Sequence, residues 1–249
     1  MDRNLWTQEL TTTSCPPYRC VACGKGSLIL VKDSLIYKDT AETAKSRGHE
    51  EFDWDWVSYI FTAWAQCTHS SCKQQYAISG DGGVEPQMNE EGDFVFANYF
   101  MPKSCCPMPD IIEFPPKCPE DVVRELRGAF AIFWLNEAAC TTRLRVALEY
   151  LMTYLGVPKS KQGANDKLSD MSLHDRIDAF AKQEPAIGAQ LMALKWLGNT
   201  GSHDSQVSAN DLLDAFEIME HALKEIVGGH SARMIELAKK LTMKHSASK

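Results

Sequence analysis

A change in composition at residues 112–119 is the feature that most constrains the fold of this 249-residue chain. Before this stretch, the sequence is rich in Cys, Gly, Trp and Phe, and its apolar runs are short, as in strands joined by loops. After it, apolar residues recur at helical spacing. The stretch itself contains Pro115, Pro116 and Pro119. We therefore predict domains at residues 1–113 and 114–229, followed by a basic helix or tail at 230–249.

The short apolar runs of the first part predict a small β-rich domain made of short strands. The expected strands are 28–31 paired with 35–37 as a hairpin, 54–64, 76–79 and 94–100. The Asp-Gly-Gly at 81–83 predicts a turn, and the acidic stretch 40–55 predicts an exposed insertion.

The second part predicts helices with clear start and stop signals. The first begins at Pro119 and runs to about Leu135, and Ser172 and Ser208 are expected to cap later helices. The others are predicted at residues 136–155, 173–181, 185–197, 209–227 and 232–244, and the last of these could equally be a frayed tail. The predicted fold class is α+β, with a small zinc-ribbon-like β domain followed by an all-α helical bundle.

Two cysteine pairs predict a metal site. Cys20 and Cys23 are three positions apart and are followed by two glycines, which leave room for backbone amides to face the sulfurs. Cys67 and Cys72 form a second, wider pair. Four sulfur ligands on two loops would hold a structural Zn²⁺ with no open position for water. His69 could replace one of these cysteines.

Other interpretations of the cysteines stay open. Cys105 and Cys106 lie in a Pro-flanked segment and compete for the role of metal ligand. The chain has nine cysteines, and in a reducing compartment they can also be unligated buried thiols. Cys15, Cys118 and Cys140 are not expected to take part in a metal site.

The charge and hydropathy of the sequence limit the classes of protein to which the chain can belong. The net charge of −7 argues against a nonspecific nucleic-acid binder. Residues 1–117 hold 10 Lys/Arg and 16 Asp/Glu, whereas residues 118–249 hold 16 and 17, so a polyanion would meet the second half. No apolar run reaches transmembrane length and the first residues do not resemble a signal peptide, so we expect a cytoplasmic protein without membrane contact.

The stretch 194–203 is the main candidate site of the second part. It predicts the end of a helix, a Gly-Asn turn at Gly198 and Asn199, and a histidine, His203, just beyond. His203 could act as a general acid or base, and Asn199 could contact a phosphate or hold the imidazole ring. Alternatively, Asn199 only caps the helix and His203 satisfies a loop carbonyl.

The helical half resembles a known family. The motifs that carry the resemblance are 114–116 (Phe-Pro-Pro), 119–123 (Pro-Glu-Asp-Val-Val), 138–139 (Ala-Ala), 143–149 (Arg-Leu-Arg-Val-Ala-Leu-Glu) and 197–203 (Leu-Gly-Asn-Thr-Gly-Ser-His). Their order is similar to that of prokaryotic domain-of-unknown-function family 4145, which is often grouped with the HEPN (higher eukaryotes and prokaryotes nucleotide-binding) superfamily. The resemblance implies a HEPN-like helical bundle, often homodimeric, behind a cysteine-rich segment.

Many HEPN proteins are metal-independent ribonucleases of defence systems, and their motif places an Arg and a polar residue a few positions before a His. Asn199 and His203 match the last two, but Gly198 occupies the place of the Arg. Lys195 is the nearest cation in the sequence, and Arg143 or Arg145 could approach from another helix to position a phosphate. Lysine lacks the guanidinium fork that grips phosphate.

Two functions are therefore expected to compete. One is a non-catalytic module, with a role in antiphage defence implied by the resemblance, that binds a nucleic acid such as RNA, a nucleotide or a partner protein. The other is a ribonuclease in which His203 is the acid or base and Asn199 and Lys195 position the phosphate. A homodimer is expected because apolar residues surround most of the helix predicted at 136–155. Arg145 and Glu149, four positions apart, are expected to form a salt bridge.

Overall fold

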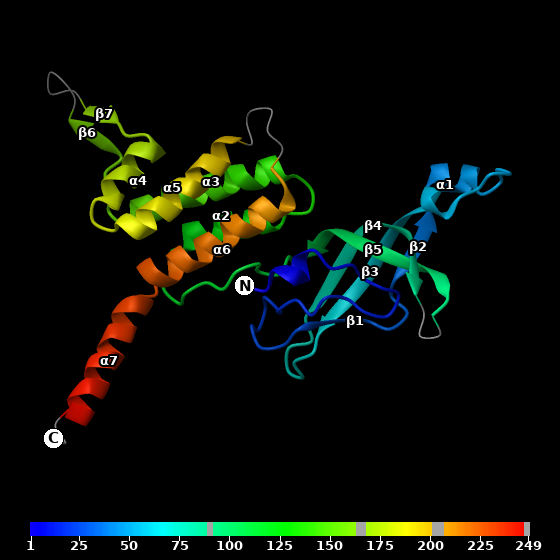
Figure 1. Cartoon of the computed structure of the whole chain (residues 1–249), viewed down its shortest axis with the longest axis horizontal. Coiled ribbons are helices and arrows are strands. Elements are labelled where there is room, and N and C mark those ends of the chain that lie inside the picture. The colour runs from blue at the N-terminus through cyan, green and yellow to red at the C-terminus, as the bar shows by residue number, and fades with distance from the viewer. Residues whose placement is uncertain (89–91, 163–167, 201–206, 247–249) are drawn as a thin grey trace. The chain divides into compact units, whose positions relative to one another are not determined.

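The computed structural model describes residues 1–88, 92–162, 168–200 and 207–246 (Figure 1). Its backbone contacts divide the chain into two compact units. The N-terminal unit comprises residues 2–111 together with 130–135. The helical unit comprises Met1, residues 112–129 and residues 136–249.

The N-terminal unit is built on a five-stranded antiparallel sheet in the order β1-β3-β4-β5, with β2 also paired to β3. The strands are β1 (Leu28–Leu30), β2 (Ile36–Asp39), β3 (Ser58–Cys67), β4 (Gln75–Met88) and β5 (Phe94–Cys106). Along β3 every second side chain is buried, from Tyr59 to Cys67, and the residues between them face outward. This alternation is what a sheet with one covered face requires.

The predicted hairpin between residues 28–31 and 35–37 is wrong, because β1 and β2 do not pair with each other. Leu28 pairs with Cys67 at one end of β3, whereas Asp39 pairs with Tyr59 at the other end. The ten residues of β3 are long enough to hold both short strands along one edge. The local sequence could not show this, because the partner strand lies some 20 or more residues away.

Two further local predictions in this unit are wrong. Residues 81–83 lie inside β4 rather than in a turn, and a Cβ on Gly82 would come within 2.4 Å of the carbonyl oxygen of Tyr99 on β5. The expected strand 54–64 begins only at Ser58, because Trp54–Trp56 form a 3₁₀ turn capped by Asp53. Gly82 therefore allows β4 and β5 to pair closely and does not mark a reversal of the chain.

The stretch 40–55 is more ordered than an exposed insertion. It contains the short helix α1 (Ala41–Ser46), capped by Thr40. The side chain of Thr43 is buried, and its hydroxyl accepts a hydrogen bond from the backbone amide of Ser58 at 2.8 Å. This bond joins α1 to the start of β3.

An aromatic cluster forms part of the core of the N-terminal unit. The ring of Trp6 lies 4.9 Å from that of Tyr18 and 5.8 Å from that of Trp134, and the indole of Trp134 donates a hydrogen bond to the carbonyl of Trp6. The predicted helix to Leu135 accordingly stops at Phe130, because residues 130–135 belong to this unit and not to the helical one.

The helical unit follows most of the sequence predictions. Its helices are α2 (Glu120–Phe130), α3 (Glu137–Tyr154), α4 (Leu173–Ala181), α5 (Pro185–Thr200), α6 (Ala209–Ile226) and α7 (His230–Ser246). The predicted caps are confirmed, since Ser172 and Ser208 each open a helix through a capping box with Asp175 and Asp211.

The predicted all-α class of this half is wrong, as is the small zinc-ribbon-like domain. Between α3 and α4 the chain forms an antiparallel pair, β6 (Ser160–Gln162) and β7 (Leu168–Asp170). These three-residue strands carry no apolar alternation, so nothing in their composition marks them. In the N-terminal unit, β3, β4 and β5 are 10, 14 and 13 residues long, which makes a curled sheet rather than a ribbon.

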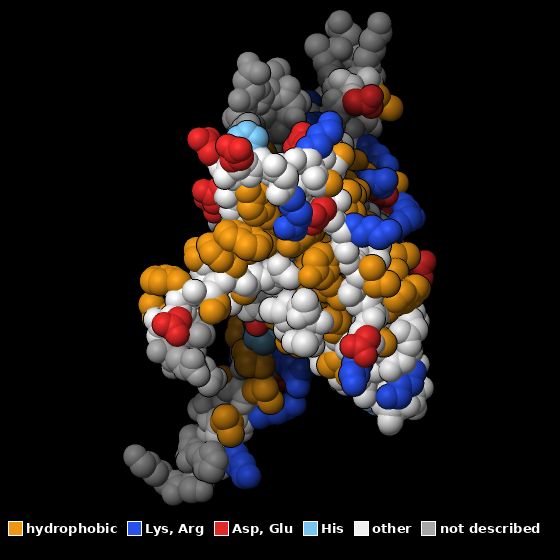
Figure 2. Space-filling view, turned by 90° about the vertical axis from the view of Figure 1, so that its right-hand side faces the viewer, with side chains coloured by type: hydrophobic (Ala, Val, Ile, Leu, Met, Phe, Trp, Pro, Cys, Tyr) orange, Lys and Arg blue, Asp and Glu red, His pale blue; other side chains and the backbone are white. Residues whose placement is uncertain are grey.

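The surface carries both charged and large apolar side chains, and Figure 2 shows the apolar ones in several groups on one side of the molecule. Among the described residues, no helix combines the length and apolarity needed to cross a membrane.

Candidate functional site

The first cysteine pair lies in a tight turn just before β1. The amide of Cys20 donates to the carbonyl of Gly26 at 2.9 Å, and the amide of Gly24 donates to the carbonyl of Cys20 at 2.8 Å. Gly24 has a φ of 62°, a conformation that favours glycine. A Cβ on Gly26 would lie 2.6 Å from the Sγ of Cys67, so only glycine lets the two turns approach.

The second pair lies where β3 turns into β4. Cys67 is the last residue of β3, and the amide of Cys72 donates to the carbonyl of His69 at 3.0 Å within the connecting loop. Leu28, which follows the first turn, pairs with Cys67. The register of β1 on β3 thus brings the two cysteine turns together, although about 45 residues separate them in the sequence.

The four sulfurs form one compact group. The Sγ atoms of Cys20, Cys23, Cys67 and Cys72 all lie within 4.8 Å of one another. Cys20 Sγ is 3.8 Å from Cys72 Sγ, and Cys23 Sγ is 3.6 Å from Cys67 Sγ. These separations are far longer than a disulfide bond of about 2.05 Å. They agree with the edge of about 3.8 Å of a tetrahedron with metal–sulfur bonds of about 2.3 Å.

Hydrogen-bond donors surround the sulfurs. The amide of His69 lies 3.4 Å from Cys67 Sγ, and the hydroxyl of Tyr76 donates to Cys20 Sγ at 3.2 Å. The backbone amides of Gly26 and Lys25 lower the pKa of Cys23 to about 6, whereas burial raises the pKa of Cys67 to about 12. Donors of this kind stabilise negative charge on sulfur, as thiolate ligands of a metal require.

The competing ligands do not join the group. The ring of His69 accepts or donates a 3.0 Å hydrogen bond with the Ser71 hydroxyl, and Cys105 Sγ donates to the carbonyl of Pro107. Neither His69 nor Cys105 or Cys106 belongs to the group of described residues that could hold a metal ion. The arrangement is therefore compatible with a metal site made of the four predicted cysteines.

The second candidate site, at the C-terminal end of α5, differs from its prediction. Helix α5 continues to Thr200, so the expected Gly-Asn turn is wrong. A Cβ on Gly198 would lie 3.2 Å from the Cβ of Arg145 and 3.5 Å from the carbonyl oxygen of Thr141. Gly198 therefore serves the close approach of α5 to α3.

The two arginines of α3 face different neighbours. Arg143 pairs with Glu125 of α2, with Nη1 2.8 Å from Oε2, and lies beside Gly128. Arg145 lies beside Gly198 of α5. Residues two apart on a helix point to nearly opposite sides, so only Arg145 is near the end of α5.

Lys195 and Trp196 form a cation–π contact near this end. Lys195 Nζ lies 3.6 Å from the centre of the Trp196 ring, and Lys195 is 7% exposed. Trp196 is exposed, and the ring of His174 on α4 lies edge-on to it with the ring centres 6.0 Å apart. The face of an indole ring attracts a cation placed over it, so this contact stabilises the local packing of α5. The side chain of Asn199 and the whole of His203 lie outside the described residues.

The sequence did not reveal the network around Arg176. This residue of α4 is 2% exposed, and its guanidinium donates to the Glu149 carboxylate at 3.1 Å, to the Thr153 hydroxyl at 3.0 Å and to the Val157 carbonyl at 3.1 Å. Glu149 was expected to pair with Arg145 through helical spacing. Its long-range partner could not be inferred, because the contact depends on how α4 packs against α3.

Two family models match the chain. Residues 8–104 match a domain of unknown function (DUF8608), and residues 127–246 match another (DUF4145). No curated protein and no solved structure matches the chain. The N-terminal unit is thus similar to one family and the helical unit to another, and the resemblance of the helical half to family 4145 is confirmed.

Proposed function

We propose that the chain is a non-catalytic binding module whose N-terminal unit is held together by a structural Zn²⁺ on Cys20, Cys23, Cys67 and Cys72. The observation that carries the proposal is the close group of four sulfurs at tetrahedral separations. Four thiolates satisfy zinc completely and leave no position for water or substrate, so the metal would stabilise the fold without taking part in chemistry. Elemental analysis of freshly purified protein should give about one zinc per chain.

The exposed surface of the N-terminal unit favours a protein as the binding partner. Ile29, Ile36, Ile60 and Trp64 lie on β1, β2 and β3, and each is more than half exposed. Ile60 and Trp64 occupy the outward positions of β3. An exposed group of large apolar side chains of this kind is typical of a protein interface. The part of the sequence that forms this sheet has more acidic than basic residues, so the surface is unsuited to a polyanion. We call these four residues the outer strip.

The outer strip can be tested without harming the fold. Ile60→Ser with Trp64→Ser removes exposed apolar area, so the free energy of unfolding should change by about 1 kcal/mol or less. The wild-type chain, purified gently from its native cells, should retain a stoichiometric partner that the double variant loses. Lys32→Ser with Lys45→Ser, which are also exposed but lie outside the outer strip, is the control that should keep the partner. Equal retention by the Ile60/Trp64 variant would contradict the proposal.

A ribonuclease is a second candidate, favoured by one observation. The Cβ and Cδ of Arg145 on α3 lie beside Gly198 on α5, the position at which the HEPN motif has its Arg. An arginine on α3 near this end of α5 could grip a phosphate.

RNA cleavage separates the two functions. Under the binding-module proposal, wild type and His203→Ala should leave single-stranded RNA equally intact over hours. A cleavage activity that disappears in His203→Ala and in Arg145→Ala, but persists in Arg143→Ala, would establish the ribonuclease instead. Arg143 is the matched control because it faces α2, away from Gly198.

A further inference from the structure

The paired ends of β4 and β5 extend past the start of β3. Ser58, the first residue of β3, pairs with Gly83 of β4. Beyond that point β4 and β5 continue as a two-stranded ribbon, whose last pair joins Met88 to Phe94. A ribbon of two strands needs further strands or another element packed on its apolar face to be stable. The apolar face of this ribbon therefore requires a cover.

The core side of the ribbon is apolar and largely uncovered. Every second residue of a strand faces the same side, so Phe94 and Phe96 share the face of the buried Phe100. Met88, Phe94 and Phe96 are nevertheless each more than half exposed. Trp54 covers part of this face, because its ring stacks on that of Phe96 with the ring centres 5.3 Å apart, but Trp54 is itself 42% exposed. We call Trp54, Met88, Phe94 and Phe96 the aromatic surface.

Exposed carboxylates flank Trp54. Asp53 and Asp55 are its neighbours in the 3₁₀ turn, and Glu50 and Glu51 come shortly before them. Within the described residues, none of these four carboxylates forms an ion pair with a Lys or Arg. The aromatic surface is thus bordered by negative charge.

Basic side chains do not offset this charge. Residues 50–56 and 84–98 contain no Lys or Arg. Arg47 is close, since its guanidinium lies 5.9 Å from the centre of the Phe52 ring. That guanidinium is already paired with the carboxylate of Asp39, with Nη2 2.9 Å from Oδ1. The charge of the four carboxylates is therefore left to be balanced from outside the chain.

We propose that the aromatic surface binds a basic segment of a partner protein. The face of an aromatic ring attracts a cation, and a guanidinium can also stack flat on it, so arginines of the partner would lie against Trp54 and Phe96. Asp53 and Asp55 would complement their charge. Apolar side chains of the same segment would cover Met88. A nucleic acid or an anionic lipid has the wrong sign of charge for this surface.

The inference goes beyond the proposed function, because it concerns a second surface of the N-terminal unit. Ile60 and Trp64 of the outer strip occupy the outward positions of β3, whereas the aromatic surface lies on the core side of the sheet. The variant Ile60→Ser with Trp64→Ser should therefore bind a basic probe as wild type does. Failure of one proposal is in this way distinguishable from failure of the other.

Fluorescence anisotropy with the full chain tests the proposal. The probe is a short labelled peptide in which arginines are separated by Gly, Ser and Leu. In the comparison peptide each arginine is replaced by citrulline, which keeps the shape of the side chain and removes its charge. The arginine peptide should bind saturably in about 0.15 M salt. Its affinity should exceed that of the citrulline peptide by about tenfold or more.

The decisive variant is Asp53→Asn with Asp55→Asn. It removes two charges, while an asparagine at position 53 can still cap the 3₁₀ turn. The affinity for the arginine peptide should fall by about tenfold, with the melting temperature unchanged. Trp54→Ser with Phe96→Ser removes the two stacked rings and should lower the affinity at least as much.

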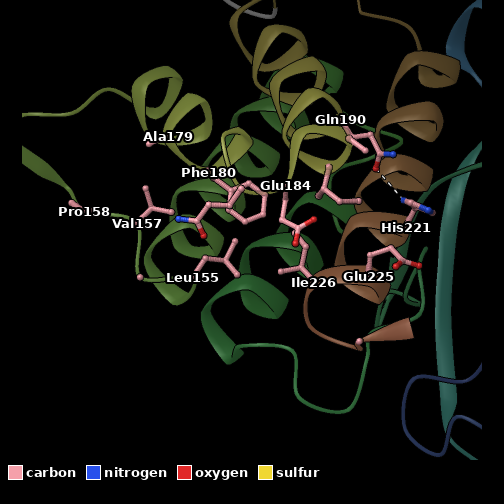
Figure 3. Close-up of a pocket in the computed structure, with 15 residues that line it drawn as sticks. Leu155, Val157, Pro158, Ala179, Phe180, Glu184, Gln190, His221, Glu225 and Ile226 are labelled. Atoms are coloured by element: carbon pink, nitrogen blue, oxygen red, sulfur yellow. Dashed lines mark hydrogen bonds between the residues drawn. The ribbon is translucent and has the colours of Figure 1, made fainter. Parts of the chain in front are cut away.

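A groove on the helical unit supplies the matched control (Figure 3). Its volume is about 780 Å³, and residues of the segment after α3, of α4, of α5 and of α6 line it. It also combines apolar side chains, such as Phe180 and Ile187, with the exposed carboxylate of Glu184. A basic peptide could be drawn there for similar reasons, so Glu184→Gln distinguishes the two places. This variant should bind the arginine peptide with the affinity of wild type.

Three results would overturn the proposal. The first is a wild-type chain that does not bind the arginine peptide, or that binds the citrulline peptide equally well. The second is full affinity in the Asp53/Asp55 variant. The third is a loss of binding in Glu184→Gln or in the Ile60/Trp64 variant, which would place the peptide in the groove or on the outer strip.

Discussion

Replacing Cys20 by serine should release the proposed Zn²⁺ and unfold the N-terminal unit. A serine hydroxyl is a poor zinc ligand, and the three remaining cysteines would lose the cation that holds the two turns together. Because metal binding contributes directly to folding in such sites, we expect a loss of about 3 kcal/mol or more, which corresponds to a fall in melting temperature of roughly 10 °C or more. Zinc analysis and thermal melting followed by tryptophan fluorescence measure the two effects.

Cys106→Ser is the matched control for this variant. Cys106 lies on β5 of the same unit, is exposed and does not belong to the group of four sulfurs. Its replacement should leave zinc content and melting temperature unchanged. A strong chelator should reproduce the effect of Cys20→Ser on wild type, and added zinc should reverse it. A Cys20→Ser protein that keeps one zinc per chain would contradict the assignment of the ligands.

Replacing Arg176 by alanine should destabilise the helical unit by about 3 kcal/mol. The guanidinium donates to both the carboxylate and the carbonyl of Glu149, to Thr153 and to Val157. Arg176 itself is 2% exposed, so removing it takes the donor from these partly exposed acceptors and leaves a cavity. Chemical denaturation followed by circular dichroism at 222 nm measures the loss, because helices dominate this unit.

The control is an arginine of the same unit with an exposed ion pair. Arg124 lies 2.6 Å from the carboxylate of Asp121, and both side chains are more than half exposed. Its replacement by alanine should cost about 1 kcal/mol or less, because solvent screens such a pair. Arg176→Lys should recover only part of the loss, since an ammonium cannot reach the same set of acceptors. Equal stability of Arg176→Ala and Arg124→Ala would show that the buried network contributes nothing.

Helices were predictable because their signals are local. The capping boxes at Ser172 and Ser208 and the cap at Asn136 each depend on residues within one turn of the helix start, and all three are present. The end of α5 was not predictable from Gly198, because a glycine that allows a turn also allows close helix packing. The distinction depends on whether another helix, here α3, lies against it.

The sequence alone determined which four cysteines could form a metal site, because paired spacing and nearby glycines are local properties of each turn. It also determined that the second half is mainly helical. Only the tertiary structure decided that β1 and β2 share one edge of β3, that Arg145 rather than Arg143 approaches Gly198, and that Arg176 binds Glu149. These contacts join residues far apart in the chain, and their free energy depends on burial and packing that no local pattern records.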